Sequence, residues 1–185
     1  MSKCGRTTVL AIVGLLTVAS SASARTGERF SNDEFGFSGI LPSGRVKCFG
    51  TTNTHIHGVG TVLVGRDCEN RTRNPTLGIW ADYNTLSSIS AVEVLAGDPR
   101  CGGKPPRVAS GIWADAIDGL ETAVCESEGP EGQRVLVLAA QSGASDDGEK
   151  KPEINYVVYL ETNKGRHSED LSVFRNFLAT LKIRK

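Results

Sequence analysis

Two histidines that lie one residue apart are the side chains in this sequence best suited to chemistry. His55 and His57 precede an apolar run at residues 59–64. If this segment is extended, both imidazoles project from one face of the backbone, close enough to share a Zn²⁺ or Cu²⁺ ion. A complete metal site needs three or four ligands. The sequence offers further ligands at Asp67, Asp82 and Asp115.

A polar loop is the alternative explanation of the same two histidines. Residues 51–54 are threonines and an asparagine, and Gly58 follows His57. Residues of these types are typical of loops, and a loop does not need its histidines to bind a metal. We therefore expect no cofactor, and we keep a Zn²⁺ or Cu²⁺ site at His55 and His57 as the alternative.

Asp82 and Asp115 offer a second kind of chemistry. If the strands that carry them adjoin, the carboxylates form a pair, and paired carboxylates can separate their pKa values and do acid–base catalysis. Aspartates at strand ends more commonly accept backbone hydrogen bonds or face water. Residues 102–104, Gly-Gly-Lys, lack the spacing of a phosphate-binding loop, and residues 36–39 carry only half of a nucleophile elbow. The sequence favours a protein that is not an enzyme but leaves catalysis open.

The first 24 residues have the anatomy of a secretory leader. Lys3 and Arg6 give a positive start, residues 9–18 are apolar, and Ala24 ends a run of small residues. The apolar run is shorter than the roughly 20 residues that span a bilayer as a helix. We therefore expect cleavage near Ala24 and a periplasmic or extracellular protein.

The cysteine count supports the same compartment. Cys4 leaves with the leader, and four cysteines remain, at positions 48, 68, 101 and 125. An even number in an oxidising compartment indicates two disulfides. Of the three possible pairings we favour Cys48–Cys68 and Cys101–Cys125, because each pair brackets two neighbouring strands. No Cys-x-x-Cys pair is present, which argues against a zinc site made of four thiolates.

The remaining chain, residues 25–185, has the length of a single domain. The whole sequence has 21 basic and 21 acidic residues, so loss of Lys3 and Arg6 leaves it slightly negative. No basic patch stands out, which argues against a nucleic-acid partner, and no second apolar run is long enough to span a membrane. We expect another protein as the partner, and the oligomeric state stays open.

One loop is a candidate contact surface for that partner. Arg71 and Arg73 lie next to Cys68, and arginines beside a disulfide are already ordered for protein contacts. Asp82 and Asp115 complete the candidate surface residues. The alternative for the loop is an ordinary solvated surface.

Alternating and continuous apolar runs predict the strands. They lie at residues 35–40, 45–49, 58–65, 78–82, 108–117, 120–127, 135–140 and 154–161. Asp118-Gly119 predicts a hairpin turn between two of them. A first helix is predicted over residues 86–96, with Asn84 or Thr85 as its N-cap and Gly97 as its end.

Apolar residues at spacings of three and four predict a final helix that begins at Ser168. Its stripe consists of Leu171, Phe174, Phe177, Leu178 and Leu181.

A five-residue sequence occurs twice. Gly-Ile-Trp-Ala-Asp is found at residues 78–82 and again at residues 111–115, each time ten residues after a cysteine. Two copies are too few for a repeat architecture. We expect both copies to be strands with the tryptophan on the core face and the aspartate at the rim.

These elements predict an α+β fold, in which an antiparallel sheet of six or seven strands is packed by an internal helix and a C-terminal helix. The Phe-rich opening with its Leu-Pro turn, residues 30–42, and the closing segment 154–183 with Val-Phe-Arg-Asn-Phe-Leu-Ala-Thr-Leu resemble the Mog1/PsbP-like fold. The resemblance implies a non-catalytic binding or assembly factor. The repeated pentapeptide and the four cysteines lie outside this resemblance.

The sequence therefore predicts a secreted or periplasmic, non-enzymatic binding protein, either of the inhibitor or immunity type or an assembly factor. The alternative is a metal-binding protein or metal-dependent hydrolase that uses His55 and His57.

Overall fold

The computed structural model describes residues 27–43, 46–49, 61–64, 76–84, 89–129, 132–142 and 153–184. For residues 46–49 and 61–64 it describes the backbone only. The described residues form an antiparallel sheet of seven strands, a second sheet of three strands and two α-helices. The predicted α+β class is therefore confirmed.

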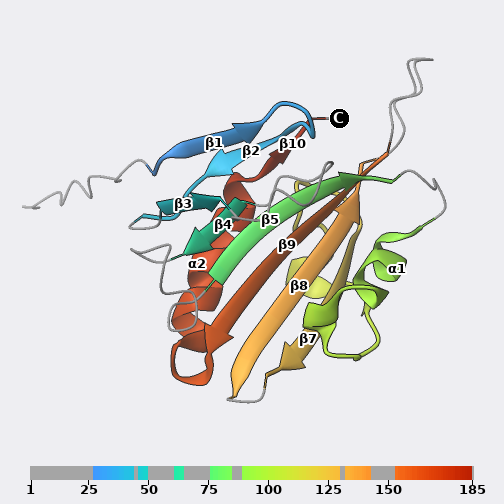
Figure 1. The fold of residues 1–185 in the computed structure, drawn as a ribbon, viewed down its shortest axis with the longest axis vertical. Coiled ribbons are helices and arrows are strands. Elements are labelled where there is room, and N and C mark those ends of the chain that lie inside the picture. The colour runs from blue at the N-terminus through green and yellow to red at the C-terminus, as the bar shows by residue number, and fades with distance from the viewer. Residues whose placement is uncertain are drawn as a thin grey trace, which may run out of the picture.

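The large sheet has the strand order β3-β4-β5-β9-β8-β7-β6. Its strands are β3 (Val46–Phe49), β4 (Thr61–Val64), β5 (Thr76–Tyr83), β6 (Arg107–Val108), β7 (Thr122–Glu128), β8 (Gln133–Gln141) and β9 (Ile154–Asn163). Strands β5, β9, β8 and β7 form its centre (Figure 1). The small sheet has the order β1-β2-β10 and consists of β1 (Arg29–Asn32), β2 (Phe37–Ile40) and β10 (Lys182–Ile183).

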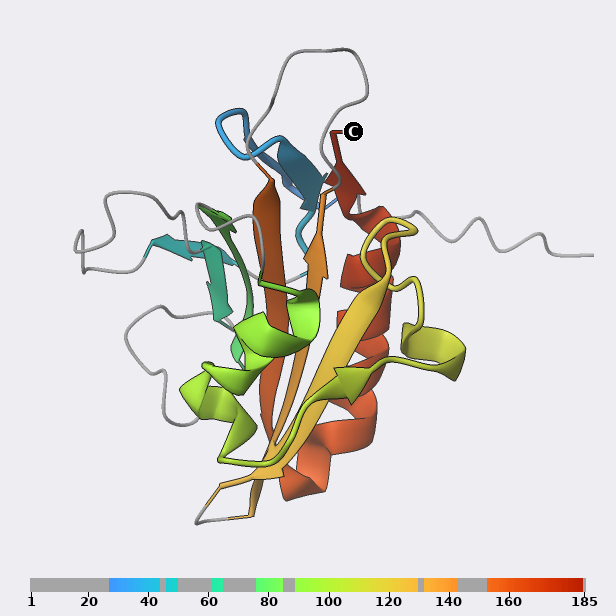
Figure 2. The same ribbon diagram turned by 90° about the vertical axis from the view of Figure 1, so that its right-hand side faces the viewer.

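The two α-helices lie on opposite faces of the large sheet, as Figure 2 shows. They are α1 (Ala91–Ala96) and α2 (His167–Thr180), and the short 3₁₀ turns are η1 (Pro99–Cys101), η2 (Gly111–Trp113) and η3 (Lys164–Arg166). The long helix α2 packs on β9 and β2, whereas α1 packs mainly on β8 and β7. The α1 face of the sheet is therefore covered over part of its width (Figure 1).

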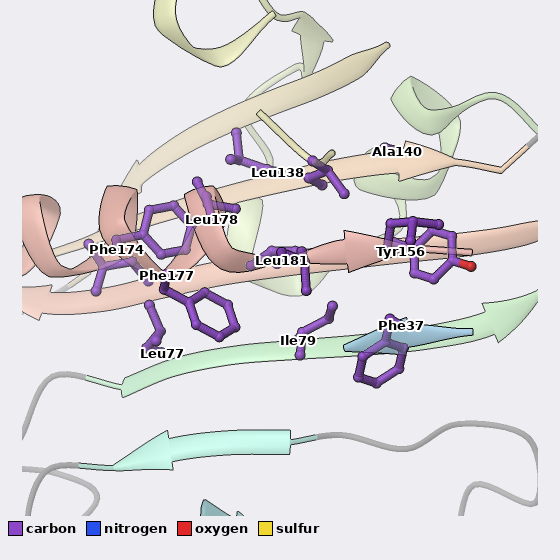
Figure 3. Packing of buried hydrophobic residues seen from close by; sticks show 14 of the residues in the cluster. Phe37, Leu77, Ile79, Leu138, Ala140, Tyr156, Phe174, Phe177, Leu178 and Leu181 are labelled. Atoms are coloured by element: carbon purple, nitrogen blue, oxygen red, sulfur yellow. The ribbon is translucent and has the colours of Figure 1, made fainter. Parts of the chain in front are cut away.

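The main core lies between the sheet, α2 and the small sheet (Figure 3). Ile79 of β5, Tyr156 of β9 and Phe174 and Phe177 of α2 all belong to this cluster, and all four side chains are buried. The Tyr156 hydroxyl donates a hydrogen bond of 2.7 Å to the Phe35 carbonyl, so the one polar atom of this ring is satisfied. Burial raises the pKa of Tyr156 to about 12.

Both predicted helix starts are wrong. The N-cap of α1 is Ser90, whose hydroxyl accepts a hydrogen bond from the Glu93 backbone N–H, while the Glu93 carboxylate accepts one from the Ser90 backbone N–H. This capping box fixes the start of α1 and overrides the apolar spacing that begins at residue 86. Helix α2 continues from η3 and begins at His167, so Ser168 lies inside the helix and does not cap it. The predicted end of α1 at Gly97 is confirmed.

The predicted strand over residues 108–117 is also wrong. Strand β6 ends at Val108, and the second copy of the pentapeptide forms the 3₁₀ turn η2. The hairpin turn itself is confirmed: Asp118 and Gly119 have φ angles of 47° and 78°, and Ile117 pairs with Leu120 across them.

Candidate functional site

A groove lies beside α1, on the part of the sheet that this helix leaves uncovered. It has a volume of about 530 Å³. Its lining residues come from β5, β9 and the segment from α1 to η1: Trp80, Val94, Gly97, Asp98, Pro99, Arg100, Tyr159 and Glu161. The described lining residues combine aromatic rings and charged groups, and none of them is a serine, cysteine, histidine or lysine.

The register between β5 and β9 sets the floor of the groove. Gly78 pairs with Tyr159, and Trp80 pairs with Val157. Paired residues of an antiparallel sheet share a face, so Trp80, Tyr159 and Glu161 lie in a row along it. A Cβ atom at Gly78 would lie 2.6 Å from three atoms of the Tyr159 side chain. The glycine therefore allows the Tyr159 ring to lie directly on β5.

Arg100 and Asp98 form a closed ion pair above this ring. The Arg100 guanidinium lies 3.9 Å from the centre of the Tyr159 ring, a cation–π contact. Its Nε and Nη2 atoms donate to the two Asp98 carboxylate oxygens at 2.9 and 2.6 Å. Asp98 Oδ1 also accepts from the Arg100 backbone N–H at 2.9 Å and so caps η1. Each carboxylate oxygen of Asp98 is therefore already bonded.

The chain that carries Arg100 is fixed on both sides. The Arg100 carbonyl accepts a hydrogen bond of 2.6 Å from the Ser127 hydroxyl on β7. The next residue, Cys101, forms a disulfide with Cys125 on the same strand, with the two Cα atoms 5.6 Å apart. The groove wall is thus attached to the sheet by covalent and hydrogen bonds, and the guanidinium is held in place before any ligand binds.

Glu161 is the carboxylate in the groove that the ion pair does not satisfy. It is half-buried, and among the described residues its carboxylate has no hydrogen bond or ion pair. Burial raises the pKa of Glu161; the Arg100 charge lowers it and the Asp98 charge raises it. Because the charges of Asp98 and Arg100 cancel, the described lining residues carry one net negative charge when Glu161 is ionised.

A second hollow of about 340 Å³ lies near the N-terminal half of α2. Trp113 of η2 lines it, with the Arg175 guanidinium 5.5 Å from the ring centre. Its other charged groups have both signs, and Arg134 lies 3.7 Å from Glu128 at an exposed position. Surface ion pairs of this kind contribute little to stability. Because the described lining residues carry charges of both signs, the hollow has no charge of one sign that would select a ligand.

The predicted metal ligands His55 and His57 lie outside the described residues, as does Asp67. In the described part of the chain, no three His, Cys, Asp or Glu side chains lie close enough together to hold a metal ion. Zinc or copper binding at His55 and His57 stays a prediction. Metal analysis of the purified protein and of a His57→Ala variant tests it.

The predicted carboxylate pair requires the segments that carry Asp82 and Asp115 to lie side by side, and they do not. Asp82 is the residue before the last in β5, which pairs with β4 and β9, whereas Asp115 follows η2 on an exposed turn. The two copies of the pentapeptide therefore do not adjoin. The candidate contact residues Arg71 and Arg73 lie outside the described part of the chain, and their role stays a prediction.

The structure contains the disulfide that spacing favours between Cys101 and Cys125. The backbone of Cys48 lies in β3, which pairs with β4 as expected, but the Cys48 side chain and Cys68 are outside the description. The Cys48–Cys68 bridge stays a prediction. Among the helices that the structure describes, none is long and apolar enough to cross a membrane.

The sequence analysis missed the groove. The sequence predicts Trp80 on a core face; its ring packs against the cluster on the α1 side of the sheet but stays half-buried and lines the groove. No motif in the sequence singles out Arg100 or Asp98. The one local signal is Asp98-Pro99, an N-cap followed by a proline, which marks η1 but not the ring on which Arg100 lies.

No protein-family model matches the sequence, and no curated protein is significantly similar to it. A solved structure with the same fold is the solution structure of cyanobacterial PsbP (CyanoP) from Synechocystis sp. PCC 6803, with a TM-score of 0.52 and 13% sequence identity. The match covers 92% of this chain and 100% of the other. The chain therefore has a PsbP-like fold, which confirms the PsbP part of the predicted resemblance.

Proposed function

We propose that this protein is exported and acts without catalysis, by binding another protein through the groove between α1 and strands β5 and β9. The observation that carries the proposal is the groove floor, where the half-buried Trp80 and Glu161 flank the Tyr159–Arg100 stack on a rigid frame. Tryptophan, tyrosine and arginine are the residues most enriched at the energetic centres of protein interfaces. An inhibitor, an immunity-type protein and an assembly factor would all act in this way.

The lining residues support binding over chemistry. Their titratable groups are two carboxylates, an arginine and a tyrosine, and Asp98 is fully engaged by Arg100. Acyl transfer would need a nucleophile with an adjacent base, and the lining residues that the structure describes include no such pair. The PsbP-like fold agrees with an accessory role, but fold alone does not fix function, so the groove carries the argument.

Export is part of the proposal. Residues 1–24 have the pattern of a leader, and the Cys101–Cys125 disulfide belongs to an oxidising compartment. We expect the native protein in the periplasm or outside the cell, with Arg25 near its new N-terminus. Intact mass measurement on the protein from that fraction tests this, and a native protein that retains Met1 in the cytoplasm would contradict it.

Site-specific photo-crosslinking in the source cells tests the groove. A photoreactive residue is placed at Ala96, an exposed position beside the groove, or at Asn176, an exposed position on α2. We expect a discrete protein adduct from position 96, its loss when Trp80→Ala is added, and no adduct from position 176. No adduct from position 96, or equal adducts from both positions, would contradict binding through the groove.

A further inference from the structure

We propose that the groove recognises an extended segment of the partner protein, with a lysine or arginine at Glu161 and an apolar side chain four residues away at Trp80. This inference rests on the proposed function and specifies its ligand. It follows from two properties of the groove: the sign of its unsatisfied charge and the spacing of the side chains along its floor.

The charge selects a basic residue. Asp98 and Arg100 satisfy each other through two hydrogen bonds, so neither needs a ligand. Glu161 is half-buried and has no ion pair among the described residues. A carboxylate that loses water without gaining a partner is destabilised, and a nearby opposite charge stabilises its ionised form. A lysine or arginine head group at this end of the groove supplies that charge.

The register sets the distance to the second contact. Trp80 pairs with Val157, and Glu161 lies four residues further along β9. Four residues of a strand span roughly 13 Å, which is too far for one side chain to contact both. An extended peptide has the same rise and alternation, so its residues i and i+4 reach Glu161 and Trp80 from the same face.

The middle of the groove adds a third requirement. The Arg100 guanidinium already covers the Tyr159 ring at 3.9 Å, and it lies between the two ends of the row. The peptide side chain at i+2 projects toward this stack and must be small. At the far end, Trp80 and Val94 offer the apolar contact. The recognised pattern is thus a basic residue, a small residue and an apolar residue at alternate positions.

Fluorescence of Trp80 provides the measurement. The protein has two tryptophans, and Trp113→Phe leaves Trp80 as the sole reporter while keeping an aromatic ring against Phe174. The probes are acetylated peptides of serine and threonine that carry one leucine and one lysine, two, four or six positions apart. A fourth peptide replaces the lysine by glutamate at the spacing of four.

We expect the spacing of four to bind most tightly, and the glutamate peptide to bind at least about tenfold more weakly. Glu161→Gln should weaken the lysine peptide by about tenfold. Glu121→Gln, the same substitution at an exposed position outside the groove lining, should leave its affinity unchanged.

Equal affinity for the lysine and glutamate peptides, no optimum at four, or no effect of Glu161→Gln would overturn the proposal. If the peptides fail while position 96 still crosslinks to a partner, binding through the groove stands and the ligand pattern is wrong. Sedimentation tests whether the groove binds a second copy of this chain instead. Self-association that Glu161→Gln abolishes would overturn the proposal.

Discussion

The two copies of Gly-Ile-Trp-Ala-Asp have the same sequence and different structures. The copy at residues 78–82 is an extended part of β5, between β4 and β9. The copy at residues 111–115 begins with the 3₁₀ turn η2, and its glycine has a φ angle of +60°. The comparison separates what five residues specify by themselves from what their neighbours specify.

The side chains exchange roles between the copies. Ile79 is 0% exposed in the main core, whereas Ile112 is 64% exposed. Both tryptophans are half-buried, but Trp80 lines the groove on the α1 face, and Trp113 packs on Phe174 with ring centres 6.2 Å apart. The same pentapeptide therefore lines the groove in one place and covers the core in the other.

The flanking residues account for the difference. Thr76, Leu77 and Tyr83 extend the first copy into an eight-residue strand with a partner on each side. The second copy lies between a two-residue edge strand and the tight turn at Asp118. There the Ala114 carbonyl accepts from the Thr122 backbone N–H at 3.1 Å, which holds the segment folded back. Pairing decides the conformation, because β propensity depends strongly on context.

Truncating the two isoleucines should give the largest difference between the copies. Ile79→Ala leaves a cavity in a fully buried site and should lower the free energy of unfolding by about 2–5 kcal/mol. Ile112→Ala removes an exposed side chain and should stay within about 0.5 kcal/mol of the unmodified protein. Urea unfolding of both variants measures this. Similar losses would mean that Ile112 is covered in solution.

The two glycines should give a smaller difference, for distinct reasons. Gly78→Ala forces a Cβ atom to 2.6 Å from the Tyr159 ring, and such overpacking should cost about 1–3 kcal/mol. Gly111→Ala meets no atom within 4 Å but must keep a positive φ angle, which costs about 1–2 kcal/mol. Urea unfolding compares the stability of the two variants, and their affinity for the lysine peptide distinguishes them further.

Only Gly78→Ala should also weaken the lysine peptide, because it displaces the Tyr159 ring from the groove floor. An equal loss of peptide affinity in Gly111→Ala would show that the ring on β5 does not set the groove.

The apolar pattern of the sequence predicts those elements that bury the same face, or both faces, along their whole length. The apolar run of residues 135–140 lies inside β8, between α1 and α2, and the stripe through Phe174, Phe177 and Leu178 is the buried face of α2. The second copy of the pentapeptide has the same apolar pattern as the first, so its own five residues predict a strand where a 3₁₀ turn forms. For α1 the Ser90–Glu93 capping box marks the start of the helix better than the apolar spacing upstream.

The groove could not be predicted from local pattern. It depends on the pairing of Gly78 with Tyr159, which lie far apart in the sequence. It also depends on a disulfide that holds Cys101, and with it Arg100, against β7. Neither contact appears as a periodic pattern in the sequence, so the sequence predicts the strands β5 and β9 and the cysteines but not the surface that they create.

The smallest expected effect on stability concerns two carboxylates, Glu161 beside the first copy of the pentapeptide and Glu121 near the second. Glu161 lies opposite Thr76 on the strand pair of the first copy, and burial raises its pKa. A raised pKa in the folded state means that folding favours the protonated form. This contribution is fully present below the ordinary pKa of a glutamate and is lost as the pH rises through the folded value.

Glu161→Gln should therefore raise the free energy of unfolding near neutral pH, and its advantage over the unmodified protein should shrink as the pH falls to about 4. Glu121, near the second copy, is exposed, so Glu121→Gln should show no such trend. Urea unfolding at several pH values measures both. An advantage of Glu161→Gln that grows at low pH would mean that Glu161 is stabilised as a carboxylate in the folded protein, and the groove would then already contain its cation.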